Sequence, residues 1–204
     1  MAYSAFSLKD VKQKLGIQVI ENERLFAQIS SIAISPFLRT ALEKYVSLAL
    51  AINTEKSRSE WIIAPILAEL REQLRGTVSI FSGKKFDVDV ARGLDGYCDY
   101  LVSLNPEQYY ISAPILAIVE AKNEAIVDGF GQCIATMLAA RLFNEREQLP
   151  LPAVFGAVTT GTNWKFLKLR ENTAYIVLDE YYLKEIDLIM GIFVHIAQLE
   201  TQAG

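Results

Sequence analysis

Histidine and cysteine are scarce in this chain, with one histidine and two cysteines in 204 residues. Structural zinc sites need several thiolate or imidazole ligands at close spacing, and Cys98 and Cys133 form no C-x-x-C pair. The sequence therefore argues against a zinc centre. We expect both cysteines to be small core residues with reduced thiols.

An excess of basic residues is also absent, because 20 Lys and Arg are set against 24 Asp and Glu, a net charge of −4. This balance argues against a protein whose whole surface binds nucleic acid indiscriminately. It leaves room for a local basic groove. It also suits an enzyme in which metal ions supply the positive charge.

Long apolar runs are missing as well. The most apolar stretch near the C-terminus, residues 186–199, is short for a membrane span and carries Asp187 and His195. We interpret it as a buried helix in which His195 is packed. The polar start MAYSAFSLKD shows no secretory signal pattern. The sequence thus predicts a cytoplasmic protein without a membrane partner.

Hydrophobic periodicity predicts alternating helices and strands. Helices are expected over 7–14, 36–52, 59–74 and 129–143 and at the C-terminus, with Pro65 kinking or delaying the third. Strands are expected over 17–21, 78–83, 86–94, 97–103, 114–122, 152–160, 163–170 and 174–180, with a hairpin turn at Asp95-Gly96. We predict an α/β fold of the α+β type, a mixed sheet flanked by helices, with a right-handed parallel crossover from Pro114 to Thr159.

We expect a single domain over 1–204, without a linker. A core over 57–172 would follow an N-terminal helical addition over 1–56, and a C-terminal strand and helix over 173–204 would complete it.

Charged residues end the buried strand PILAIVEAK, and they are the strongest functional signal. Glu120 and Lys122 are two positions apart, so their side chains share one face of the strand. Asp99 is the charged residue of the neighbouring strand YCDYLVS. Two carboxylates on adjacent strands are hard oxygen ligands for Mg²⁺. Lys122 could orient or deprotonate a water, or stabilise negative charge developing on phosphorus.

Asp99 and the E-x-K of Glu120-Ala121-Lys122, in this order of elements, resemble the PD-(D/E)xK nuclease superfamily. The pattern is closest to the nuclease regions of restriction subunits and related bacterial proteins. The resemblance covers about residues 59–170 and implies a restriction-endonuclease-like core: helix, three antiparallel strands, helix, strand, strand. It also implies a helical glutamate, matched by Glu60, and a glutamine after E-x-K, matched by Gln132. The proline of the family motif is absent before Asp99.

This resemblance implies hydrolysis of nucleic acid, with DNA preferred over RNA. Asp99, Glu120 and Glu60 would hold Mg²⁺, or Mn²⁺ as a substitute, with Lys122 and Gln132 completing the site. Lys165 and Lys168 are candidates for phosphate contacts. Cutting a duplex often needs two active sites, so a homodimer is a further expectation.

Other readings of the same residues stay open. Glu120 and Lys122 could form a surface ion pair, and Gln132 could simply face water. Asp87 and Asp89 form another carboxylate pair, for which a solvated strand face is the simpler interpretation. For the whole chain, two alternatives are a catalytically inactive module that binds nucleic acid or protein, and an unrelated mixed-sheet protein that binds a small ligand. The last alternative predicts that Asp99 and Glu120 lie far apart.

Overall fold

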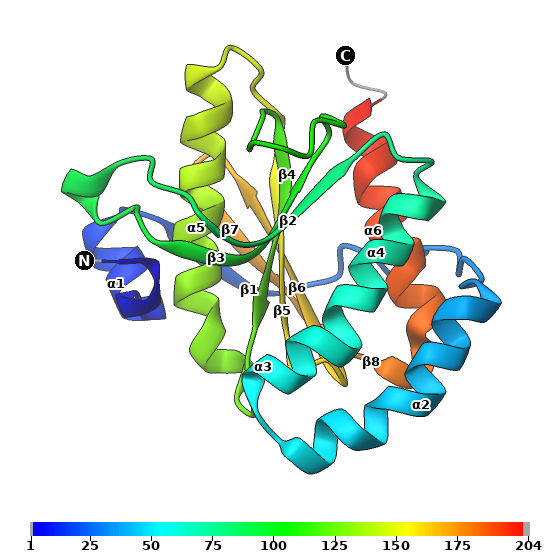
Figure 1. The fold of residues 1–204 in the computed structure, drawn as a ribbon. Coiled ribbons are helices and arrows are strands. Elements are labelled where there is room, and N and C mark those ends of the chain that lie inside the picture. The colour runs from blue at the N-terminus through cyan, green and yellow to red at the C-terminus, as the bar shows by residue number, and fades with distance from the viewer. Residues whose placement is uncertain (1, 202–204) are drawn as a thin grey trace.

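A computed structural model of the chain describes residues 2–201 (Figure 1). Its helices are α1 (Leu8–Lys14), α2 (Pro36–Ile52), α3 (Glu55–Arg58), α4 (Ala64–Gln73), α5 (Ile126–Arg146) and α6 (Ile186–Thr201). Its strands are β1 (Gln18–Glu23), β2 (Ser79–Lys85), β3 (Tyr97–Ser103), β4 (Ile115–Ala121), β5 (Val154–Thr159), β6 (Asn163–Arg170), β7 (Thr173–Val177) and β8 (Tyr181–Tyr182). The predicted α/β class is confirmed.

The strands form one mixed sheet in the order β1-β7-β6-β5-β4-β3-β2, with β8 beside β6. Strands β2, β3 and β4 pair antiparallel, whereas β4 and β5 pair parallel. Parallel neighbours need a crossover connection, and α5 supplies it. The parallel crossover expected between Pro114 and Thr159 is therefore confirmed.

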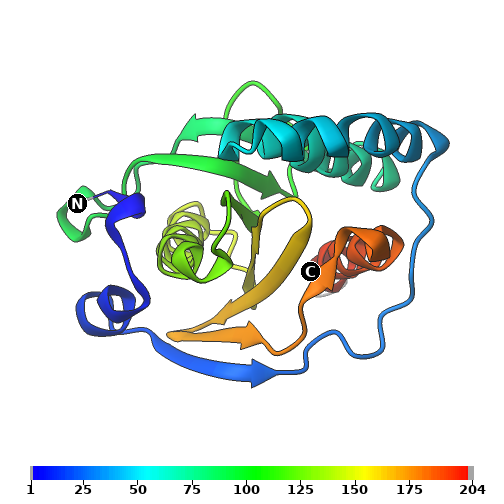
Figure 2. The ribbon, with the colours of Figure 1, turned by 90° about the horizontal axis from the view of Figure 1, so that it is seen from below.

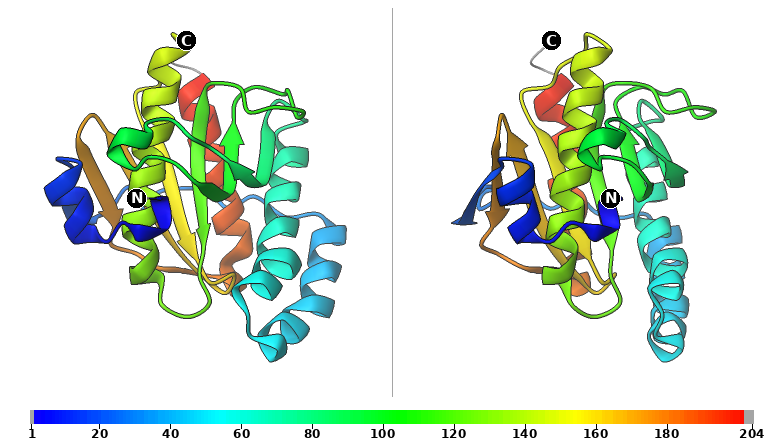
Figure 3. Two further views of the ribbon diagram at one scale, coloured as in Figure 1. Left: turned by 60° about the vertical axis from the view of Figure 1, so that its left-hand side comes forward. Right: turned by 90° about the vertical axis from the view of Figure 1, so that its left-hand side faces the viewer.

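Helices cover both faces of the sheet (Figures 2 and 3). Helix α5 and α1 pack against one face, while α2, α4 and α6 pack against the other, and each face has its own apolar cluster. The stretch 186–199 lies within α6, where Ile189, Met190 and Ile192 are fully buried. The predicted buried C-terminal helix is thus confirmed.

Within residues 2–201, α5 is the one helix long and apolar enough to cross a membrane. However, 61% of its most apolar window is buried inside the protein. Its residues pack against the sheet as well, since Ile134, Met137 and Leu138 are almost fully buried. We therefore interpret α5 as a core helix of the fold.

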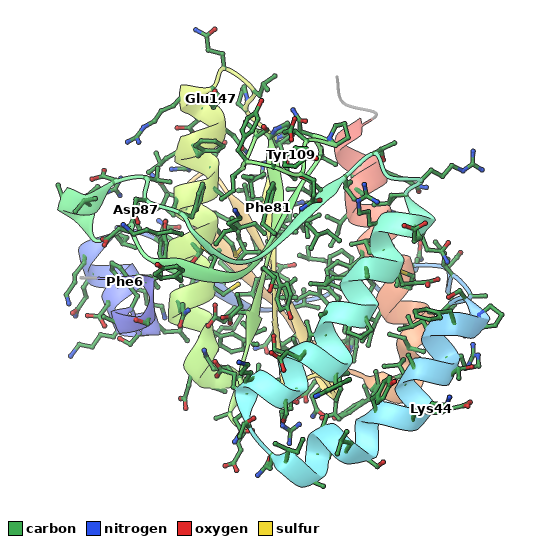
Figure 4. The ribbon with its side chains drawn as sticks, viewed as in Figure 1. Phe6, Lys44, Phe81, Asp87, Tyr109 and Glu147 are labelled. Carbon is green, nitrogen blue, oxygen red and sulfur yellow. The ribbon has the colours of Figure 1, made fainter. Side chains whose placement is uncertain are left out.

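The segment between β2 and β3 corrects one prediction. Residues 86–94 form no strand, and β2 pairs directly with β3, so Asp95-Gly96 is not a simple hairpin turn. Instead the chain protrudes from the sheet, with Asp87 in the protrusion (Figure 4). Asp87 accepts a hydrogen bond from Gly96 N, and Asp89 caps a short 3-10 turn at Val90–Arg92. These side-chain bonds to the backbone replace the ladder bonds of a strand.

Helices α2 and α3 lead into the site. Ser35 caps α2, and Asn53 ends it in the left-handed conformation, with φ of 53°. After α3, residues Ser59–Ile63 form a π turn, in which Ala64 N donates to Ser59 O. Pro65 follows directly in the first turn of α4. The helical turns run without a break from Glu55 to Gln73, so Pro65 does not delay the start of the helix, and the irregularity beside it is the π turn.

Candidate active site

The ends of β3 and β4 bring Asp99 and Glu120 together. The two strands pair with Tyr100 opposite Val119, and continuing this register places Asp99 opposite Glu120. Asp99 Oδ2 accepts a hydrogen bond from the backbone N of Ala121 at 2.8 Å. The carboxylates are therefore neighbours, contrary to what an unrelated small-ligand protein would require.

Lys122 lies between acidic side chains. Its Nζ donates to Glu120 Oε1 at 2.6 Å, and it is 3.9 Å from Glu55 Oε2. The Glu120 side chain is 2% exposed and that of Lys122 is 18% exposed. This is a largely desolvated pair, so the interpretation of Glu120 and Lys122 as an ordinary surface ion pair is wrong.

Glycine lets α5 approach this lysine. A Cβ placed on Gly129 would lie 2.5 Å from Val158 Cγ1 and 3.2 Å from Lys122 Cγ. Any larger residue would push the helix away from the sheet or displace the lysine. The backbone N of Lys122 also donates to Thr159 O at 2.8 Å. Both contacts fix Lys122 beside the end of β5.

Burial and charge shift the pKa values in the cluster. Burial, together with the nearby Asp99 carboxylate, raises the pKa of Glu120 to about 8, and Lys122 only partly compensates. Burial lowers the pKa of Lys122, but the carboxylates of Glu120, Glu55 and Asp99 outweigh it and raise that pKa overall. Lys122 is therefore a protonated ammonium in a pocket of surplus negative charge.

Glu55, on α3, is a member of the cluster that the sequence did not reveal. Burial raises its pKa, Lys122 lowers it, and Asp99 raises it, with an increase overall. Glu60, the glutamate predicted to join the site, instead pairs with Lys56 at 3.7 Å, and its side chain is 55% exposed. The structure thus brings Glu55 to Lys122 and leaves Glu60 at the edge.

A pocket of about 320 Å³ opens beside the cluster. Its lining comprises Glu55, Lys56, Ser59, Glu60, Ala64, Ser82, Gly83, Asp99, Tyr100 and Ala121. Ser59 and Glu60 belong to the π turn, and Ser59 Oγ is 2.6 Å from the Tyr100 hydroxyl oxygen. Such turns are frequent at functional sites. Asp99 is therefore reachable from solvent, with Glu120 behind it.

The remaining predicted residues are more distant. Gln132, on α5, is partly buried, and within residues 2–201 it makes no side-chain hydrogen bond to the cluster. Lys165 pairs with Val158, which pairs with Glu120, so Lys165 lies two strands away, about 10 Å. Its Nζ donates to Leu178 O.

Lys168 lies on the opposite face of the sheet from Lys165, because the two are three positions apart in β6. Its Nζ lies 5.7 Å from the centre of the Phe155 ring. The structure therefore does not gather the two lysines into a single binding surface.

The prediction that both cysteines are small core residues is confirmed. Cys98 and Cys133 are buried free thiols. Trp164 is fully buried, with Nε1 donating to Gly161 O. Asp87 pairs with Lys85 at 2.6 Å and stabilises its own loop, away from the cluster.

Over residues 2–201, no three His, Cys, Asp or Glu side chains are grouped closely enough to hold a metal ion. Lys122 is the cation among the carboxylates instead. Comparison with protein-family models and with curated proteins finds no match for this chain. Any functional conclusion therefore depends on the site itself.

Proposed function

We propose that this protein is a metal-dependent nuclease that hydrolyses phosphodiester bonds, with DNA as the preferred substrate. One observation carries the proposal: a partly buried lysine ammonium hydrogen-bonds Glu120, with Asp99 and Glu55 beside it, next to an open pocket. Perturbed titratable groups at a cleft are typical of functional sites.

The connectivity supports the same proposal. Helical residues 55–73, strands β2, β3 and β4, helix α5 and strands β5 and β6 follow one another in the order expected of a restriction-endonuclease-like core. The antiparallel pairing of β3 with β4, which brings Asp99 beside Glu120, supports the PD-(D/E)xK resemblance. Fold alone implies no activity, so the proposal relies on the side chains.

The chemistry of the donors suits a divalent cation, although within residues 2–201 no three of them are grouped closely enough to hold one as they stand. Asp99, Glu120 and Glu55 offer hard oxygens, and burial first, then the Asp99 carboxylate, raises the pKa of Glu120. Asp99 and Glu120 would hold Mg²⁺ or Mn²⁺, with Glu55 in the place predicted for Glu60. When bound, such an ion polarises a phosphoryl oxygen and lowers the pKa of its water.

Lys122 acts through its charge. Its pKa is raised by the surrounding carboxylates, so it is a donor and not a base near neutral pH. We assign it the stabilisation of negative charge developing on the phosphoryl oxygens as water attacks and the leaving oxygen departs. Gly129 and the Thr159 carbonyl hold it in position for this role.

Cleavage of labelled DNA and RNA in Mg²⁺ tests these roles. Lys122→Met keeps the length of the side chain and removes its charge, and we expect a loss of about 10²–10³-fold in rate. Glu55→Gln and Glu60→Gln form a matched pair on neighbouring turns. The first should lower the rate much more than the second, and equal effects would contradict the assignment of Glu55.

A second function, an inactive module that binds nucleic acid, is favoured by one observation. Lys122 already neutralises part of the carboxylate cluster, and no metal-ligating group is formed in the described residues. Titration calorimetry with Mn²⁺ separates the two functions. Heat of binding that disappears in Asp99→Ala supports the nuclease, whereas its absence from the unaltered protein supports the inactive module.

A further inference from the structure

A second polar pocket, of about 560 Å³, lies near the Glu55–Lys122 contact. It is lined by Asn53, Arg58, Asn123, Glu124, Ile126, Val127, Thr160, Thr162, Asn163 and Glu180. Arg58 follows Glu55 by one turn of α3, and Asn123 follows Lys122 directly. In Figure 1, α3 and the start of α5 lie at the same end of the molecule, and Figure 2 views that end. The pocket thus adjoins the candidate active site.

The Arg58 guanidinium in this pocket makes no ion pair in the described residues. Arg58 is the single basic residue in the lining and is partly buried. Its Nη1 donates to Thr160 O and its Nη2 to Asn53 Oδ1, both at 3.0 Å. Both acceptors are neutral, and in the described residues no carboxylate lies within 4.0 Å of the guanidinium. A partly buried guanidinium without an ion pair is suited to pairing with an anion.

Other groups in the lining have unused hydrogen-bonding capacity. Arg58 Nε and Asn123 Oδ1 are both buried and lack a hydrogen-bond partner, but Asn123 Oδ1 is an acceptor and adds no donor for an anion. A guanidinium has five N–H donors, and only two are used here. Asn123 also has an amide donor, and the Thr162 hydroxyl is 3.1 Å from that of Thr160. This set is suited to an oxyanion, because charged and neutral donors converge from α3, the loop after β4 and the turn after β5.

We infer that this second pocket binds a backbone phosphate of the nucleic-acid substrate, next to the phosphate that is cleaved, with Arg58 as its anchor. The inference rests on the proposed nuclease function and adds a positioning residue to it. The strand would pass from the first pocket across Glu55 and Lys122 into the second. A contact of this kind fixes the register of the strand without reading its sequence.

Two carboxylates, Glu124 and Glu180, line the same pocket as Arg58, so the net charge of the lining does not attract an anion. Both are exposed, and Glu180 accepts a hydrogen bond from Asn163 Nδ2 at 2.6 Å. Exposed charges are screened by solvent and salt, whereas a partly buried guanidinium is screened less. The proposed phosphate contact therefore depends on the Arg58 guanidinium itself.

Arg58→Gln tests the inference, with Lys44→Gln as the control. Lys44 is an exposed residue of α2, so Lys44→Gln removes the same positive charge at a position away from the pocket (Figure 4). Binding of a labelled oligodeoxynucleotide is measured in chelator over a series of salt concentrations. We expect Arg58→Gln to weaken binding about tenfold and to reduce the slope of log affinity against log salt by about 0.7–0.9, with no change for Lys44→Gln. Thermal unfolding confirms that each variant is folded.

A series of modified oligonucleotides tests the same contact on the unaltered protein, so the result does not depend on whether a variant folds. Replacing single phosphates by neutral methylphosphonates should weaken binding to the unaltered protein at one position beside the cleavage site, and that effect should disappear in Arg58→Gln. If the enzyme cleaves but shows no such position, or if Arg58→Gln keeps the full salt slope, the phosphate site is wrong and the nuclease proposal stands. If the unaltered protein neither binds nor cleaves nucleic acid, both are wrong.

Discussion

Glu120→Gln should make the protein more stable at alkaline pH, because the substituted amide stays neutral where the Glu120 carboxyl is forced to ionise. The pKa of Glu120 is about 8 in the folded protein and 4.5 without the fold's influence. Between these values the unfolded chain releases the proton and the folded chain keeps it, so stability falls as pH rises. At 1.36 kcal/mol for each pKa unit, the carboxylate costs about 3–5 kcal/mol near pH 8.5. Glu120 is 1% exposed, so solvent screens little of this cost.

Urea unfolding at several pH values, in chelator, measures the effect. The variant should match the unaltered protein near pH 4.5 and exceed it increasingly up to about pH 8.5. Glu60→Gln serves as a control, because its exposed pair with Lys56 is worth only about 0.3–0.5 kcal/mol. If Glu120→Gln is less stable than the unaltered protein by a constant amount at all pH values, the reasoning about the buried carboxylate is refuted.

Three further predictions concern the scaffold. Gly129→Ala should cost about 1–3 kcal/mol in urea unfolding and slow any cleavage, because its Cβ meets Val158 and Lys122; unchanged stability would show that α5 can shift freely. Glu69→Gln should cost about 1–3 kcal/mol near neutral pH, since Glu69 accepts hydrogen bonds from Ser35 and Gln73. Burial raises the pKa of Glu69 but these bonds lower it overall, so the cost should shrink as pH falls below about 4.5, and a cost that grows in acid would contradict this. The two buried cysteines should react with a thiol reagent only on unfolding, and rapid labelling of the folded protein would disprove their burial.

Much of the site could be predicted from the sequence because its geometry is local. The spacing of Glu120 and Lys122 places them on one face of a strand, and Asp99 lies in the strand that pairs with it. The parallel crossover followed from a helical pattern between two buried strands. Each of these depends on the period of one element or on the nearest neighbour in the sheet.

Glu55 could not be predicted in this way. Its approach to Lys122 depends on where α3 packs after the left-handed turn at Asn53, and no pattern within α3 encodes that position. Glu60, expected from the resemblance, lies in the π turn and pairs with Lys56 at the edge of the site. The glutamate beside Lys122 is therefore Glu55, which lies less than two helical turns before the predicted Glu60.

Two other expectations differ from the structure for reasons that lie within a single segment. The alternating FDVDV resembled a strand, but Asp87 and Asp89 bond the loop backbone instead. The odd spacing of Lys165 and Lys168 already placed them on opposite faces of a strand, and this could have been read from the sequence.

Metal-dependent cleavage is the most direct test of the central claim, that Asp99, Glu120 and Lys122 together cut phosphodiester bonds. The purified protein is incubated with single- and double-stranded DNA and RNA in Mg²⁺, in Mn²⁺ and in chelator, beside folded Asp99→Ala. We predict cleavage by the unaltered protein that requires the metal and disappears in the variant. Intact substrate under every condition, or cleavage that Asp99→Ala retains, would contradict the account.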